Sequence, residues 1–254
     1  MAPGNERPPN ATLRFCAVTT AVSAMFWVLG SLADTELLVP GLPLSAGMFI
    51  APTIGAWSAG APPRRSDDRP PLTGFQAVWL WVACVALMPA VLVTSFLTMR
   101  IFGLTVPSQM SVSFDALAIL TLVFLLTSAC EEAGWTRFLT ATLTARWSLL
   151  TTGLAVGAMW AALHVIPYVQ AGRSWSWVAW QCAFTVAFRL IIVSAVAVLD
   201  GSWLAAVALH AAYDVTWALF PVDGSHYDPR FVAPVALGVA ICVLPRAQRR
   251  TQAT

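Results

Sequence analysis

Long runs of apolar residues recur along the whole chain, and no other feature of the 254-residue sequence constrains its fold as strongly. A bilayer core about 30 Å thick is crossed by about 20 helical residues. With Pro, Gly and Arg taken as breaks, the runs that approach this length are residues 13–33, 37–60, 75–98, 118–143, 148–168, 176–199, 202–220 and 231–245. The sequence therefore predicts an all-α fold, a polytopic membrane helical bundle with about eight transmembrane helices.

The composition excludes an ordinary soluble domain. Hydrophobic residues make up 58% of the chain and charged residues only 10%, whereas about 25% of residues are charged in soluble proteins. The basic residues are all arginines, scattered singly or in pairs, and the formal net charge is only +2. This pattern does not predict a nucleic-acid partner, and the expected partner is the lipid bilayer.

Two of the eight runs are less regular than the others. Prolines at positions 40, 43 and 52 break the second run, and a helix in lipid tolerates proline only where neighbours satisfy the freed carbonyl groups. The last run is short, and residues 100–117 are too polar to span, so we expect an interfacial loop there. The first run resembles a signal sequence up to Ala33, but the later runs favour a first helix that is retained.

The arginines are distributed unevenly between the predicted loops, and this predicts the orientation of the chain. Nine lie on the side of the N-terminus and three on the other side: Arg7, Arg14, Arg64, Arg65, Arg69, Arg146, Arg246, Arg249 and Arg250 against Arg100, Arg173 and Arg230. Because positive loops stay in the cytoplasm, we expect an integral protein of the cytoplasmic (inner) membrane with both termini in the cytoplasm.

Three segments are expected along the chain. Residues 1–117 would hold N-terminal transmembrane helices and linkers, residues 118–220 the core helices that carry the polar residues, and residues 221–254 an external loop, the last helix and a basic tail. Each of the five cysteines lies in an apolar run without the spacing of a metal site, so we interpret them as buried thiols: Cys16, Cys84, Cys130, Cys182 and Cys242.

A few ionisable residues lie inside the predicted helices, where each costs at least about 2.5–3.5 kcal/mol near the helix centre. They are functional candidates for that reason. They are Glu131, Glu132 and Arg137 in the fourth run, His164 in the fifth, Arg189 in the sixth, and His210 and Asp214 in the seventh.

The adjacent glutamates Glu131 and Glu132 suggest two separate tasks, because neighbours on a helix point about 100° apart. A desolvated carboxylate is suited to act as a general base on water, while its neighbour orients a substrate or another side chain. A pair that only faces a water-filled cleft or marks the membrane boundary would have the same sequence.

The histidines lie on two different helices. His164 shares one helical stripe with Gly153, Gly157 and Trp160, which predicts a contact face with a neighbouring helix. His210 and Asp214 are four residues apart, so the carboxylate can face the imidazole, although a helix-stabilising pair would look the same. Together with the glutamates, these groups could activate water, with or without a bound divalent metal such as zinc.

Three motifs make the sequence resemble the CPBP intramembrane proteases, the family that contains the type II CAAX prenyl protease and bacteriocin-processing or immunity proteins. The first is the glutamate pair followed by an aromatic residue and arginine, from Glu131 to Phe138. The second is Trp160 followed by His164, and the third is His210 followed by Asp214. The resemblance extends over about residues 120–220.

The resemblance implies that Glu131 activates water, that Glu132 supports it, and that His164, His210 and Asp214 complete the polar cavity. It implies an endopeptidase that cuts a membrane-associated or hydrophobic peptide, with Glu131, His164 and His210 as ligands if a metal is bound. A prenylated protein and a bacteriocin-like peptide are both open as substrates. Substrate contacts are expected from Trp135, Arg137, Trp160 and Arg189, and Arg189 is expected to face Glu132 or a substrate carboxylate.

One position departs from the family pattern. Arginine usually stands four residues after the second glutamate, whereas this chain has Thr136 there and Arg137 one position later. The change leaves open a non-catalytic alternative, in which the protein binds a toxic peptide as an immunity protein. A transporter with a Glu, His and Asp relay is a third possibility, but the chain has no internal repeat to favour it.

Overall fold

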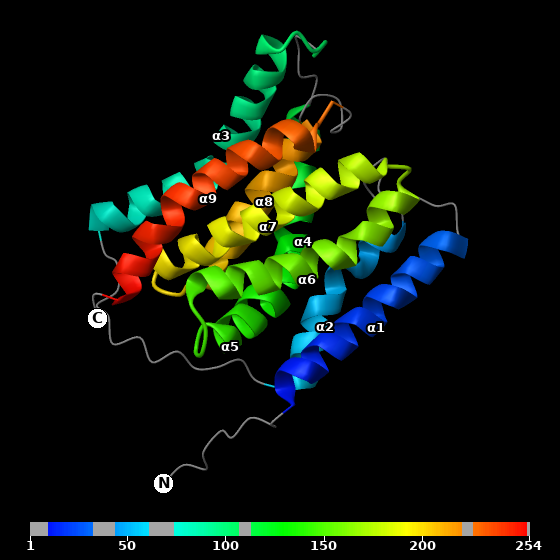
Figure 1. Cartoon of the computed structure of the whole chain (residues 1–254), viewed down its shortest axis with the longest axis vertical. Helices are drawn as coiled ribbons and strands as arrows, with labels where there is room; N and C mark the ends of the chain where they lie inside the picture. Colours follow the sequence, from blue (N-terminus) through cyan, green and yellow to red (C-terminus); the bar gives the residue numbers. More distant parts are fainter. Residues whose placement is uncertain (1–9, 33–43, 61–73, 107–112, 220–225, 253–254) are drawn as a thin grey trace.

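The computed structural model describes residues 10–32, 44–60, 74–106, 113–219 and 226–252, and these residues fold into a helical bundle (Figure 1). The elements are α1 (Ala11–Leu32), η1 (Leu44–Ile50), α2 (Ala51–Ala59), α3 (Gly74–Ile101), α4 (Phe114–Gly134), η2 (Trp135–Thr140), α5 (Ala141–Leu143), α6 (Leu149–Gln170), α7 (Trp175–Val198), α8 (Trp203–Leu219) and α9 (Pro229–Gln252). The predicted all-α membrane fold is confirmed.

The number of helices long enough to cross a membrane is smaller than the eight predicted. In the described part of the chain six segments have the required length and hydropathy: α1, α3, the continuous segment from Phe114 to Leu143, α6, α7 and α9. The run at 202–220 forms α8, which has only 17 residues. The second run forms the short pair η1 and α2, because Pro52 starts a new helix there, and its first part lies outside the described residues.

Two boundaries also differ from the prediction. The last helix is longer than 231–245 because it continues through Pro245 into the basic tail. The loop expected at 100–117 is shorter, since α3 continues to Ile101 and α4 begins at Phe114, where the Ser113 hydroxyl accepts a hydrogen bond from the Ala116 N–H as a helix cap. Residues 107–112 within that loop lie outside the described residues.

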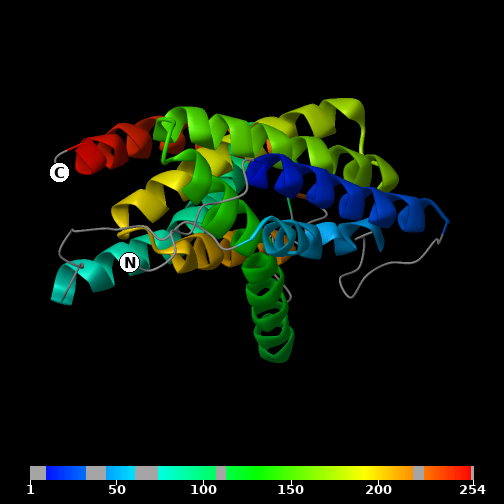
Figure 2. The same ribbon diagram turned by 90° about the horizontal axis from the view of Figure 1, so that it is seen from below.

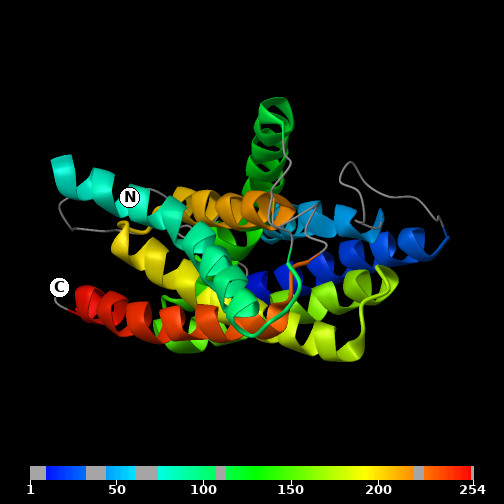
Figure 3. The same cartoon turned by 90° about the horizontal axis from the view of Figure 1, so that it is seen from above.

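The helices form two layers with α4 crossing them. Figure 2 shows α1, α6, α7 and α9 side by side in one layer, and α2, α8 and α3 in the other. The first part of α4 projects away from the bundle in Figure 3, and its apolar side chains are exposed there. The second part of α4 lies inside the bundle, which brings the glutamate pair between the layers.

Glycines allow the close packing that positions the polar residues. A Cβ atom at Gly157 would lie 3.0 Å from Val186 Cα and 3.1 Å from Arg189 Cβ, so the backbones of α6 and α7 approach closely. The stripe expected from Gly153 to His164 is confirmed as a helix contact face. Gly134, at the end of α4, packs against the carbonyl of Pro52 on α2 in the same way.

All five cysteines are free, as expected, but they are less buried than predicted. Cys84 is buried, Cys16, Cys130 and Cys182 are half-buried, and Cys242 is exposed. The exposure of Cys242 follows from its place on the outer face of α9, where apolar side chains such as Ile241 are exposed as well.

Candidate active site

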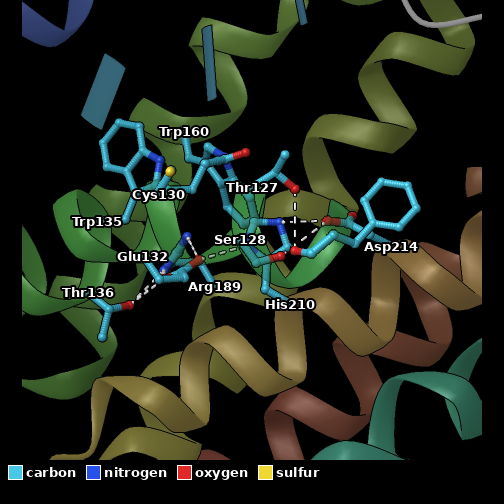
Figure 4. Close-up of polar contacts among 12 residues, drawn as sticks. Thr127, Ser128, Cys130, Glu132, Trp135, Thr136, Trp160, Arg189, His210 and Asp214 are labelled. Carbon is cyan, nitrogen blue, oxygen red and sulfur yellow. Dashed lines mark hydrogen bonds and ion pairs between the residues drawn. The ribbon is translucent and has the colours of Figure 1, made fainter. Parts of the chain in front are cut away.

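The second glutamate, Glu132, is completely buried and is the centre of a polar cluster (Figure 4). Two nitrogens of Arg189 donate to its carboxylate, Nη1 to Oε2 at 2.8 Å and Nη2 to Oε1 at 3.0 Å. His210 Nδ1 donates to Oε1 at 2.9 Å, and the hydroxyl of Thr136 donates to Oε2. The carboxylate of Glu132 is therefore fully engaged in holding other side chains.

Arg189 takes the place next to Glu132 that an arginine at position 136 would take. Its Nη1 also donates to the Thr136 hydroxyl at 3.1 Å, so the short Thr136 side chain links the two charged groups. The guanidinium of Arg189 stacks on the Trp160 ring, 4.3 Å from its centroid. This arrangement stabilises a buried ion pair because the pair has good geometry and further hydrogen bonds.

Glu131 points to a different place. It lines a cavity of about 280 Å³, and its Oε2 accepts a hydrogen bond of 2.8 Å from the indole N–H of Trp160. The other carboxylate oxygen accepts no hydrogen bond from the described residues. The two glutamates therefore have different surroundings, as their positions on the helix predicted.

The two histidines line the same cavity as Glu131. His164 Nδ1 donates to the backbone carbonyl of Trp160 at 2.9 Å, which leaves the lone pair of Nε2 free to accept a hydrogen bond. His210 has Glu132 on its Nδ1 side, and its Nε2 lies 3.5 Å from Asp214 Oδ2. The rings of Trp160 and His210 meet edge to face with centroids 5.0 Å apart.

Asp214 completes the polar end of the cavity. Its side chain is 23% exposed and also lies 3.4 Å from the Ser128 hydroxyl, which donates to Oδ2. The structure therefore brings Glu131, His164, His210 and Asp214 to one cavity, with Glu132 directly behind it. An arrangement of this kind can hold a water molecule beside a carboxylate and a carbonyl group beside an imidazole.

Two residues expected to bind substrate lie elsewhere. Arg137 is exposed and stacks against the ring of Trp203, because the π-helical turn η2 directs it away from the cavity. Trp135 is buried against Phe15 of α1, with ring centroids 5.6 Å apart. The geometry gives no support for a substrate contact by either residue.

Several residues of the cavity wall were not among the sequence candidates. Trp177 lines the outer part of the cavity with Tyr168, Gln181 and Tyr213. Gln181, Tyr213 and Tyr227 form a buried set of hydrogen bonds of 2.9–3.3 Å. A signal was present in the sequence: positions 177, 181, 184, 185 and 188 repeat with helical spacing and share one face of α7.

A metal ion does not fit these side chains as they are arranged. Within the described residues no group of three or more His, Cys, Asp and Glu is placed to hold one. One reason is that His210 is engaged by carboxylates at both ring nitrogens. No step of a reaction is therefore assigned to a metal.

Comparison with known families decides the assignment of this region. Residues 113–216 match the family model described as type II CAAX prenyl endopeptidase Rce1-like. This region belongs to the CPBP/CAAX protease family. The matched residues extend from the cap of α4 to α8 and include every polar residue of the cavity. No curated protein matches the chain.

The assignment of residues 113–216 agrees with the motifs read from the sequence. The Rce1-like region lies in a chain with six segments that could cross a membrane, so the chain is an integral membrane protein.

Proposed function

We propose that this protein is an intramembrane endopeptidase in which Glu131 activates the attacking water. The observation that carries the proposal is the different engagement of the two glutamates. Glu132 is held by three side chains, whereas Glu131 faces the cavity with a single hydrogen bond from Trp160. A general base needs access to the water from which it takes a proton, and only Glu131 has that access.

The reaction follows from the positions of the side chains. Glu131 takes a proton from a water molecule that also donates a hydrogen bond to His164 Nε2, and the water oxygen attacks the carbonyl carbon of the peptide bond. His210, with hydrogen on both ring nitrogens, places a positive charge at the polar end of the cavity, and this charge stabilises the negative carbonyl oxygen. The peptide C–N bond then breaks, and Glu131 transfers its proton to the leaving amine. The products are a carboxylic acid and an amine.

The cavity wall supports a hydrophobic peptide as the substrate. Aromatic side chains dominate it beyond the polar end, among them Phe124, Phe184 and Phe188. Such a wall favours apolar side chains and a peptide that is associated with the membrane. The non-catalytic alternative, a protein that binds a toxic peptide, was supported by Thr136 in place of the usual arginine. Arg189 pairs with Glu132 instead, so this support is weakened.

Mapping of new peptide termini in membranes tests the proposal. Cells would express the wild-type chain, Glu131→Gln, or the control Arg146→Gln, whose side chain is exposed on a turn. We expect termini that appear with the wild type and the control and are absent with Glu131→Gln. Identical termini in all three samples would contradict a glutamate-dependent protease.

A further inference from the structure

The cavity occupies only one half of the bundle. Its residues on α6 run from Trp160 to Ala171, where the helix ends, and on α7 from Trp177, near the start, to Phe188. On α8 they lie in the second half of the helix, up to Trp217. The cavity therefore extends from the middle of the bundle to the end formed by the α6–α7 turn, which we name the mouth end.

The opposite end of the bundle carries the termini of the described chain. α1 begins there and α9 ends there, at the lower left of Figure 1, together with the turns that precede α6 and α8. We name this end the terminal end. The α6–α7 turn and the start of α9 lie at the upper right of the same view.

The two ends of the bundle differ in their number of arginines. Among the arginines that the structure describes, six lie at the terminal end: Arg14, Arg137, Arg146, Arg246, Arg249 and Arg250. Three lie at the mouth end: Arg100, Arg173 and Arg230. Arg230 is paired with Asp228 at 2.6 Å, which offsets its charge. Because arginine-rich ends of membrane helices stay in the cytoplasm, the terminal end is the cytoplasmic one.

We infer that the catalytic cavity opens to the non-cytoplasmic side of the membrane and takes peptides presented there, an inference that rests on the proposed function. The substrate class is therefore an exported peptide, or one anchored in the outer leaflet, and not a protein that reaches the enzyme from the cytoplasm. Arg173, on the mouth turn, lines the entrance and stacks on Trp177 at 5.0 Å.

The dimensions of the cavity specify how far such a peptide enters. The eleven helical steps from Trp160 to Ala171 rise about 16 Å, so the bond that is cut must reach about half-way into the bilayer core.

Labelling of single cysteines tests the orientation without requiring activity. In a chain with its five native cysteines replaced, Arg173→Cys and Arg146→Cys form a matched pair at the two ends of α6, both exposed. A membrane-impermeant maleimide should label Arg173→Cys in intact cells and Arg146→Cys only after permeabilisation. Labelling of Arg146→Cys in intact cells would overturn the inference.

A second measurement keeps the native cysteines. A fluorescent protein that folds only in the cytoplasm, fused after Thr254, should fluoresce, and a dark but inserted fusion would overturn the inference. Activity in detergent is independent of orientation. If Arg146→Cys is labelled in intact cells and the enzyme is active, only the orientation of the cavity is rejected. If the labelling is as expected and the enzyme is inactive, only the proposed protease function is rejected.

Discussion

Arg189 and Glu132 form a two-pronged ion pair of 2.8 and 3.0 Å in the buried centre of the bundle, although they lie on different helices and 57 positions apart. The pair joins α7 to α4, and Glu132 in turn joins both helices to His210 on α8. One buried carboxylate thereby fixes the three helices that form the cavity. This relationship has consequences for stability that can be measured.

Arg189→Leu should destabilise the protein strongly. The substitution leaves the buried carboxylate of Glu132 without its guanidinium, and breaking a buried pair from one side costs about 3–5 kcal/mol. Thermal unfolding in detergent should show a large decrease in the melting temperature. Arg137→Leu, at an exposed arginine five residues after Glu132, is the control and should change little.

The double variant Thr136→Arg with Arg189→Leu should recover much of the lost stability. Position 136 lies in η2, and the Thr136 hydroxyl already contacts the Glu132 carboxylate, so an arginine there can pair with Glu132. Thr136→Arg alone should destabilise, because it places a second guanidinium beside Arg189 in a buried site. If the double variant is no more stable than Arg189→Leu, the claim that Arg189 replaces an arginine at position 136 as the partner of Glu132 is wrong.

Trp160→Phe should reduce activity about tenfold while the fold is kept. The substitution removes the indole N–H that orients Glu131, and a hydrogen bond to a charged group contributes about 1.5–3 kcal/mol. The phenyl ring retains the packing against Arg189 and His210. Trp57→Phe, at an exposed tryptophan, is the matched control. Equal rates for both variants would show that Trp160 does not orient the base.

Alanine at two contact glycines, Gly134 and Gly153, should destabilise the protein to different degrees, because one neighbour is rigid backbone and the other a movable side chain. At Gly134 the new Cβ would lie 2.2 Å from a backbone oxygen of Pro52, so Gly134→Ala should cost about 1–3 kcal/mol. At Gly153 the neighbour is the movable Cδ2 of Leu190, so the loss should be smaller. Gly238→Ala, with open space around it, should be neutral. A reversed order in the melting temperatures would contradict this packing.

Chelation should leave activity unchanged, because the side chains at the cavity do not form a three-ligand set. The measurement is the hydrolysis rate after dialysis against EDTA, with zinc added back in a second sample. Loss of activity that zinc restores would show that the side chains rearrange to bind a metal.

Much of this structure could be read from the sequence, because apolar length and helical spacing are local properties. The helices, the stripe ending at His164 and the different surroundings of the two glutamates follow from such patterns. The partner of Glu132 followed only in part, because the sequence left Arg189 to face either Glu132 or a substrate carboxylate. Arg189 and Arg137 were both available in the sequence, and only the packing of α6 on α7 at Gly157 brings Arg189 to the carboxylate.

Other differences have similar physical causes. The direction of Arg137 depends on the π-helical turn after Gly134, and a hydrophobicity pattern does not predict such a turn. Trp177 lies near the start of a helix, where tryptophan often anchors the membrane interface. Its place in the cavity wall depends on the neighbouring helices. The second apolar run had enough residues for a span, but in its described part a new helix begins at Pro52 and leaves two short elements.

The hydrolysis rate of the Glu131→Gln variant tests the central claim most directly. Purified wild-type and variant proteins in detergent would be compared on quenched fluorogenic peptides with apolar side chains, after their melting temperatures are shown to match. The account predicts a rate lower by about 10²–10⁴-fold, the usual contribution of a general base. A folded Glu131→Gln protein that cuts the peptides at the wild-type rate would contradict it.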